Sequence, residues 1–133
     1  MCGRALKHCF EKGIKREDIF ITTKVFPKQN HRVEESLRES LAKLQLDYVD
    51  LFLAHSVAPK INYEDHTVSG PPFHEVWAEI ERMKEIGLTK SIGVSNCTVA
   101  CYFDILSYCK VRPAVNQIEV HTYFQQTAAV KFF

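Results

Sequence analysis

The sequence predicts an α/β fold built on a parallel β-sheet, and three observations support this prediction. Short apolar runs alternate along the chain with longer stretches in which apolar residues recur at helical spacing. The apolar runs show no clean alternation of apolar and polar residues, which is typical of parallel strands covered on both faces. The resulting order of elements, α-β-α-β-α-β-α-β-α, is that of successive right-handed βαβ units.

Four apolar runs are predicted to form the strands. Each is rich in valine, isoleucine, leucine or phenylalanine, which favour strands because they pack well on a pleated surface. The runs are residues 18–25 (DIFITTKV), 47–55 (DYVDLFLAH), 90–96 (KSIGVSN) and 113–120 (PAVNQIEV).

Helical stretches separate these runs. Residues 31–46 place Val33, Leu37, Leu41 and Leu44 on one helical face, with charged residues on the other. This pattern predicts an amphipathic helix whose apolar face packs against the sheet.

Two further helices have recognisable boundaries. Residues 73–87 are periodic up to Gly87, a typical C-terminal stop, and residues 98–110 begin at Thr98, a favourable N-cap. Residues 1–13 and 125–133 are predicted to be helical at the two ends of the chain.

Two closures of the sheet fit this order: an open doubly wound sheet, or part of a (β/α)8 barrel. A complete barrel needs about 250 residues, and 133 residues with four strands supply half of one. No Gly-rich phosphate loop follows any strand, which disfavours a dinucleotide-binding doubly wound domain. The sequence therefore favours one domain, an incomplete (β/α)8 TIM barrel with flanking helices.

Composition excludes several classes of function. A formal net charge of +1 argues against electrostatic binding to nucleic acid or to an anionic membrane. The apolar runs are too short to span a bilayer, and the first residues lack the apolar core of a signal peptide. Five irregularly spaced cysteines indicate free thiols, and hence a cytoplasmic protein.

Polar side chains finish each predicted strand. Lys24 ends the first and His55 the second, while Ser95 and Asn96 end the third and Gln117 lies in the fourth. Each residue alone has an ordinary structural explanation, such as a solvated lysine, a packed histidine or a helix cap. Since ligands of parallel α/β folds bind beyond the carboxyl ends of the strands, four polar ends together predict one shared site.

At these residues the sequence resembles the aldo-keto reductase family, whose members are (β/α)8 barrels that reduce aldehydes and ketones with NAD(P)H. The resemblance covers nearly the whole chain in the family's order. It rests on REDIFITTKV (16–25), SLRESLAKLQLDYVDLFLAH (36–55), EIERMKEIGLTKSIGVSN (79–96) and RPAVNQIEVHTYFQQ (112–126).

The resemblance implies a role for each polar strand end. Lys24 corresponds to the lysine that lowers the pKa of a catalytic tyrosine, because a nearby cation favours phenolate. His55 corresponds to the histidine that orients the substrate carbonyl. Ser95, Asn96 and Gln117 correspond to residues that bind the nicotinamide carboxamide, so NADPH is the expected cofactor.

The sequence also departs from the family. Ser56 replaces the tryptophan that usually follows the histidine, and Cys97 replaces the usual phenylalanine or tyrosine after Ser-Asn. The family's catalytic aspartate and tyrosine have no counterpart in residues 1–133. We therefore expect a partial domain that lacks the N-terminal and C-terminal barrel strands and is inactive alone on carbonyl substrates.

Three alternatives remain open at this stage. A truncated remnant would act as an interaction module that self-associates through open sheet edges. A Schiff-base aldolase would use Lys24 as its amine. Tyr63 or Tyr123 would replace the missing tyrosine as a proton donor or a cofactor wall, respectively. Metal binding is disfavoured, because the histidines lack the close spacing of zinc sites.

Overall fold

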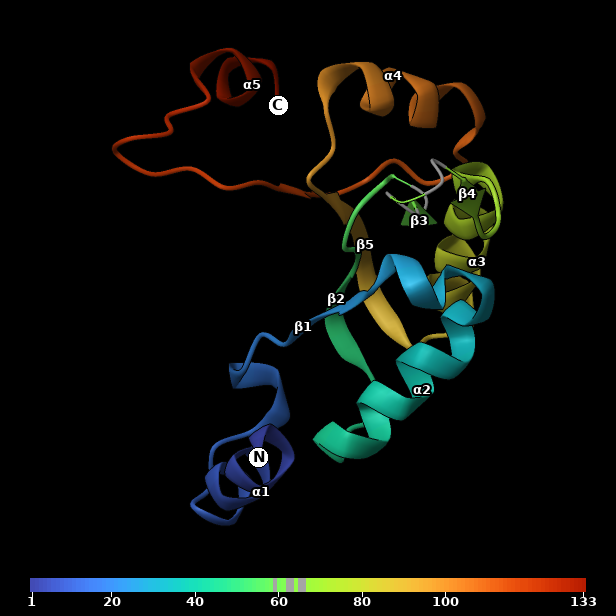
Figure 1. Cartoon of the computed structure of the whole chain (residues 1–133). Helices are drawn as coiled ribbons and strands as arrows, with labels where there is room; N and C mark the ends of the chain where they lie inside the picture. Colours follow the sequence, from blue (N-terminus) through green and yellow to red (C-terminus); the bar gives the residue numbers. More distant parts are fainter. Residues whose placement is uncertain (59, 62–63, 65–66) are drawn as a thin grey trace.

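A four-stranded parallel sheet forms the centre of the molecule (Figure 1). We describe it from a computed structural model that covers residues 1–58, 60–61, 64 and 67–133. Neighbouring strands follow the order β1-β2-β5-β6, and all pairs are parallel. The strands are β1 (Thr22–Val25), β2 (Val49–Ala54), β5 (Thr89–Ser95) and β6 (Asn116–Gln117).

Helices connect the strands. They are α1 (Cys2–Glu11), α2 (Val33–Leu44), α3 (Phe73–Glu85), α4 (Val99–Tyr108) and α5 (Thr127–Phe132). Two 3-10 turns, η1 (Arg16–Asp18) and η2 (Pro27–Arg32), flank β1, and β3 (Lys60–Ile61) pairs with β4 (Val68–Ser69) in a short antiparallel ladder. Figure 1 shows α2 and α3 side by side against the same face of the sheet.

The hydrophobic core lies between the sheet and these helices. Phe52 and Ala54 of β2 and Ile92 and Val94 of β5 point into it from alternate positions, because side chains alternate across a strand. Trp77 and Phe52 are its largest fully buried side chains. The other core residues from the strands are Val25, Val49, Ala54, Ile92 and Val94, and those from α2 and α3 are Val33, Leu37, Leu41, Val76, Ile80 and Met83.

The opposite face of the sheet, which we call the inner face, carries no helix (Figure 1). Lys24 pairs with Leu53 and Leu53 with Gly93, so these three residues share the inner face. A doubly wound sheet would carry helices on both faces. The curled sheet with helices on one side is therefore half of a (β/α)8 barrel, which confirms the predicted fold class.

An ion cluster closes the amino-terminal end of the sheet. The carboxylate of Asp50, with an 8% exposed side chain, lies 2.8 Å from Arg16 Nη2 and 3.3 Å from Lys90 Nζ. The same two cations lie over the ring of Tyr48, at 4.2 and 4.5 Å from its centroid. These contacts join the start of β2 to β5 through Lys90 and to the turn before β1 through Arg16.

The structure corrects several predicted boundaries. The run 18–25 forms a strand only from Thr22, because residues 16–18 make the turn η1. Within the run 113–120 only Asn116 and Gln117 form the strand β6, although backbone hydrogen bonds of Ala114 and Val115 to β5 lead into it. The predicted stop at Gly87 is confirmed by its φ of +79°, and the Thr98 hydroxyl accepts the predicted capping bond from the Cys101 amide.

In the described part of the chain, no helix is long and apolar enough to cross a membrane. All five cysteines carry free thiols.

Candidate functional site

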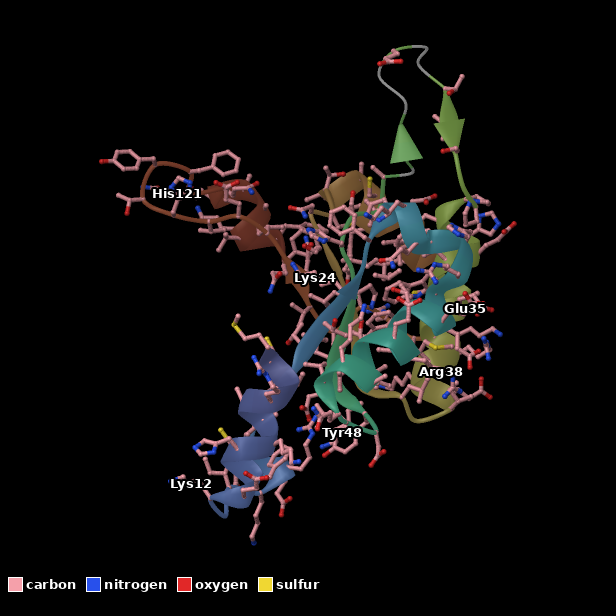
Figure 2. All side chains as sticks on the ribbon, turned by 60° about the horizontal axis from the view of Figure 1, so that its bottom comes forward. Lys12, Lys24, Glu35, Arg38, Tyr48 and His121 are labelled. Carbon is pink, nitrogen blue, oxygen red and sulfur yellow. The ribbon has the colours of Figure 1, made fainter. Side chains whose placement is uncertain are left out.

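Lys24 and His55 lie at the same end of two neighbouring strands. The backbone amide of His55 donates a 2.9 Å hydrogen bond to the carbonyl oxygen of Val25, the residue after Lys24. Figure 2 shows Lys24 on the side of β1 that faces away from α2, whereas Tyr48 lies at the far end of β2. Lys24 and His55 therefore lie at the same end of the sheet, as a shared site requires.

The surroundings of His55 keep its imidazole neutral. Burial lowers the pKa of His55, and the nearby positive charge of Lys24 lowers it further. The ring of Phe26 meets the imidazole edge-on, with 4.5 Å between the ring centroids. A neutral imidazole carries one N–H group and can donate it to a substrate oxygen.

Ser95, Asn96 and Gln117 come together beside His55. The Asn96 side-chain amide donates to the His55 carbonyl oxygen at 2.9 Å and to the Ser95 hydroxyl at 3.2 Å. The Ser95 hydroxyl in turn donates to the backbone carbonyl oxygen of Gln117 at 2.9 Å. These bonds join the carboxyl ends of β2, β5 and β6 into one continuous rim.

This rim offers unused hydrogen-bonding groups. Gln117 is exposed, and among the described residues none makes a hydrogen bond with its side-chain amide. The Asn96 side-chain oxygen also faces no donor in that part of the chain. One free amide and one free amide oxygen are the complement that a carboxamide requires, so the residues fit the amide group of a nicotinamide.

The ammonium of Lys24 has no hydrogen bond or ion pair with any described residue. Its side chain is only half-exposed and its neighbour His55 is neutral. A cation in that position favours negative charge on any group brought against the inner face.

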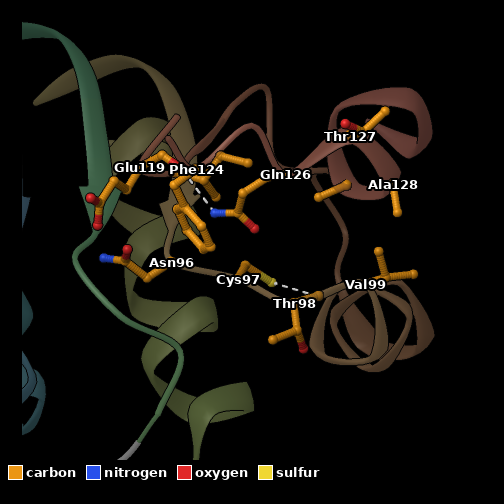
Figure 3. Close-up of a pocket in the computed structure, with 11 residues that line it drawn as sticks. Asn96, Cys97, Thr98, Val99, Glu119, Phe124, Gln126, Thr127 and Ala128 are labelled. Carbon is orange, nitrogen blue, oxygen red and sulfur yellow. Dashed lines mark hydrogen bonds between the residues drawn. The ribbon is translucent and has the colours of Figure 1, made fainter. Parts of the chain in front are cut away.

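A groove of about 560 Å³ opens beside Asn96, between the segment that follows β5 and the segment that follows β6 (Figure 3). Cys97, Phe124 and Gln126 line it, and the Gln126 side-chain amide donates to the carbonyl oxygen of Glu119 at 2.9 Å. The thiol of Cys97 is buried, and burial raises its pKa to about 12. Burial of this thiol therefore favours a packing role for Cys97.

Comparison with known proteins identifies the family. The family model described as "Aldo/keto reductase family" matches residues 1–133. The chain belongs to the aldo/keto reductase family. It is 38% identical to the NADP-dependent D-sorbitol-6-phosphate dehydrogenase of Malus domestica over 98% of this chain and 46% of that enzyme.

Solved structures of aldo/keto reductases agree with the fold. The aldose reductase of Giardia lamblia superposes with a TM-score of 0.89 at 38% identity, over 98% of this chain and 48% of that one. A Bombyx mori aldo-keto reductase (AKR2E4) in complex with NADP gives 0.89 at 33% identity, over 98% and 43%. The chain thus spans a little under half the length of these relatives.

The two tyrosines considered as substitutes and the possibility of metal binding remain to be placed in the structure. Tyr63 lies outside the described residues. Tyr123 is 96% exposed in the turn after β6. Among the described residues, no group of three or more histidine, cysteine or acidic side chains could hold a metal ion.

Sequence reasoning missed Phe26. An aromatic residue two positions after Lys24 shares the face of the lysine in a strand, which is the signal that could have singled it out. Ser56, one of the two departures from the family, accepts a 3.1 Å hydrogen bond from the Ala58 amide and so shapes the turn after β2.

Proposed function

We propose that this chain supplies the carbonyl-orienting and cofactor-binding part of an NAD(P)H-dependent reductase of aldehydes and ketones. The observation that supports this most directly is the hydrogen-bonded rim, in which Asn96 contacts both His55 and Ser95. A site that holds a substrate carbonyl beside a nicotinamide requires hydrogen-bond donors to the carbonyl oxygen and to the carboxamide at one place. The rim provides them at the mouth of a half-barrel, where ligands of this fold bind.

Each residue has a role that follows from its surroundings. His55, neutral because of burial and Lys24, donates its ring N–H to the substrate carbonyl oxygen. Lys24 stabilises the negative charge that develops on that oxygen, or on a hydroxyl group placed beside it, because an adjacent cation favours the anionic form. Ser95, Asn96 and Gln117 bind the carboxamide and so fix which face of the ring is presented.

NADPH is the proposed cofactor. When bound, it would supply the hydride that reduces the carbonyl carbon. A relative whose solved structure contains NADP shares this fold, and the apple relative is NADP-dependent. We also propose a cytoplasmic location, where free thiols such as those of this chain persist.

The 133-residue chain alone is proposed to be catalytically inactive. General-acid catalysis needs a proton donor within hydrogen-bonding reach of the carbonyl oxygen. The tyrosines that the structure describes lie at the far end of β2, on α4 or in the exposed turn after β6. None of these positions places a phenol beside His55.

Cofactor binding tests this proposal independently of turnover. NADPH added to the isotope-labelled chain should shift the NMR signals of Ser95, Asn96 and the Gln117 side-chain amide. The Gln117→Ala variant should bind at least tenfold more weakly, whereas Gln125→Ala, an exposed glutamine in the next turn, should bind normally. Shifts confined to the outer helices, or equal binding by both variants, would refute the proposed site.

A second function is supported by the exposed sheet edges. Among the described strands, β1 and β6 each have a neighbour on one side only. Open sheet edges can pair with other chains. We propose that the chain self-associates through these edges as an interaction module. Sedimentation of a concentrated sample should show mass above that of a monomer.

A further inference from the structure

Asn30 is a buried polar residue whose side chain is left without a partner. It lies in η2, between β1 and α2, and is 8% exposed. Its side-chain amide makes no hydrogen bond with any residue that the structure describes. Because an unpaired polar group in the interior is costly, buried amides in native proteins are nearly always hydrogen-bonded. The position of Asn30 therefore calls for a partner that is not one of these residues.

Three hollows meet at Asn30, with volumes of about 450, 360 and 260 Å³. The one of about 360 Å³, which we call the Asn30 hollow, is lined by Asn30, Val57, Val68, Gly70, Pro71, Pro72 and Phe73. Its walls come from η2, from the segment after β2 and from the segment that leads from β4 into α3, so it does not depend on how the sheet continues beyond β1 or β6. An apolar hollow with one polar group aimed into it is typical of a site for a small molecule.

The start of α3 adds hydrogen-bond donors at this place. α3 begins at Phe73 after Pro72, and it has no side-chain cap. Within the described part of the chain, the backbone amides of Phe73 and His74 donate to no acceptor, as is usual in the first turn of an uncapped helix. A carbonyl oxygen in the hollow can therefore accept from the Asn30 amide and from the first turn of α3, while the Asn30 side-chain oxygen can accept an N–H group.

Charge favours an uncharged ligand over an anion. A helix N-terminus alone would favour an anion. However, Glu75 and Glu79 line the neighbouring hollow of about 260 Å³, and no described lysine or arginine lines the Asn30 hollow. Arg82, which lines the hollow of about 450 Å³, is already paired with Glu34 and Glu79. A carboxylate beside Asn30 would thus be buried against apolar side chains without a cation, which is costly.

We propose that the Asn30 hollow binds a small uncharged amide with a branched apolar body. The carboxamide of the ligand pairs with the side-chain amide of Asn30, each donating one N–H group to the oxygen of the other. The apolar body packs against Val57, Val68 and Phe73. No residue of the hydrogen-bonded rim lines this hollow, so the site is separate from the rim and does not rest on the proposed function.

An NMR titration of the isotope-labelled 133-residue chain with isovaleramide tests this proposal. The matched ligand is isovalerate, which has the same apolar body and a carboxylate. Isovaleramide should shift the side-chain amide signals of Asn30 in a saturable way and should bind at least tenfold more tightly than isovalerate. Asn30→Leu, a change of similar size, should weaken the binding of isovaleramide at least tenfold. Gln29→Leu, one residue earlier in η2 and outside the three hollows, should bind it normally.

The melting temperature separates a ligand-binding role from a structural one. Because Asn30→Leu removes an unpaired buried amide, it should raise the melting temperature of the ligand-free chain. An unchanged or lower melting temperature would show that Asn30 has a partner within the fold, and would overturn the proposal. A titration without a saturable shift would mean that water alone fills the hollow. Equal or tighter binding of isovalerate would indicate an anion site at the start of α3, and either result also overturns the proposal.

Discussion

The side-chain amide of Asn96 donates a 2.9 Å hydrogen bond to the backbone carbonyl oxygen of His55, 41 residues earlier in the chain. Asn96 holds this position in the left-handed region, with a φ of +54°. Among residues other than glycine, asparagine adopts this conformation comparatively readily. One residue thus satisfies a backbone requirement and joins the carbonyl end of β2 to that of β5.

Replacing Asn96 should separate these two contributions. Asn96→Ala loses the side-chain hydrogen bonds to His55 and Ser95 and keeps an unfavourable left-handed backbone, so we expect a loss of about 2 kcal/mol in the free energy of unfolding. Asn96→Gly loses only these hydrogen bonds and should cost about 1 kcal/mol. Urea unfolding measures both values. Equal stabilities for the alanine and glycine variants would show that backbone strain plays no part.

Lys24→Met should raise the pKa of His55. Burial is the main cause of the low value and persists in the variant, so the rise is partial. An NMR titration of the imidazole measures it, with Lys84→Met on α3 as the control that should leave it unchanged. A lowered pKa also means that the unfolded chain binds a proton first on acidification, so this histidine makes folding less favourable as the pH falls below about 6.5. An unchanged or lower pKa in Lys24→Met would show that the two side chains are not electrostatically coupled.

The apolar pattern was sufficient to predict the alternating elements and the parallel sheet, whereas its closure as part of a barrel was inferred from chain length and the absence of a Gly-rich loop. It failed where pairing decides the length of a strand: residues 113–120 resemble a full strand, but only Asn116 and Gln117 form β6. The turns η1 and η2 and the β3–β4 ladder were not predicted. Their backbone bonds depend on neighbouring segments and leave no periodic signal in the sequence.

The candidate site was predictable in part for a similar reason. Polar residues at the strand ends indicated which side chains would gather, and the structure brings His55, Ser95 and Asn96 into hydrogen-bonding contact. The sequence could not show that Asn96 contacts the backbone of His55, because this depends on the register between β2 and β5. The cluster around Asp50 was also missed, since its cations come from η1 and from β5.

Asp50→Asn should destabilise the chain by about 2 kcal/mol, since a buried carboxylate that accepts charged hydrogen bonds is replaced by a neutral amide. Burial alone would raise the pKa of Asp50, but the Ile21 amide, Arg16 and Lys90 together hold it below its usual range. The measurement is the free energy of unfolding at pH 7. The matched control Asp104→Asn, on exposed α4 surface, should change it by less than about 0.5 kcal/mol.

The same variant should alter the pH dependence of stability. Because the pKa of Asp50 is lowered on folding, its contribution is complete above about pH 4 and is lost as the pH falls through the lower folded value. Wild type should therefore lose stability more steeply than Asp50→Asn on acidification below pH 4. If the free energy of unfolding fell equally with pH in the two proteins, the pKa of Asp50 would not be lowered by folding.

Gly93→Ala should detach β6 from the sheet. A Cβ atom at this position would lie 2.6 Å from the carbonyl oxygen of Val115 and 2.8 Å from Cδ2 of Leu53. That carbonyl oxygen already accepts the Val94 amide at 2.9 Å, so it cannot move without breaking the pairing of β5 and β6. We expect a loss of about 2 kcal/mol from overpacking.

Hydrogen exchange distinguishes this local effect from general destabilisation. The Asn96 amide, which donates to the Gln117 carbonyl oxygen at 2.9 Å, should exchange faster in Gly93→Ala, while amides between β1 and β2 keep their protection. Ser91→Ala, two residues earlier on the same face, should behave like wild type because it adds no atoms. Faster exchange throughout the sheet would mean that Gly93 supports the whole fold, whereas unchanged exchange at Asn96 would mean that the sheet tolerates the methyl group and that β6 is not held by this close approach.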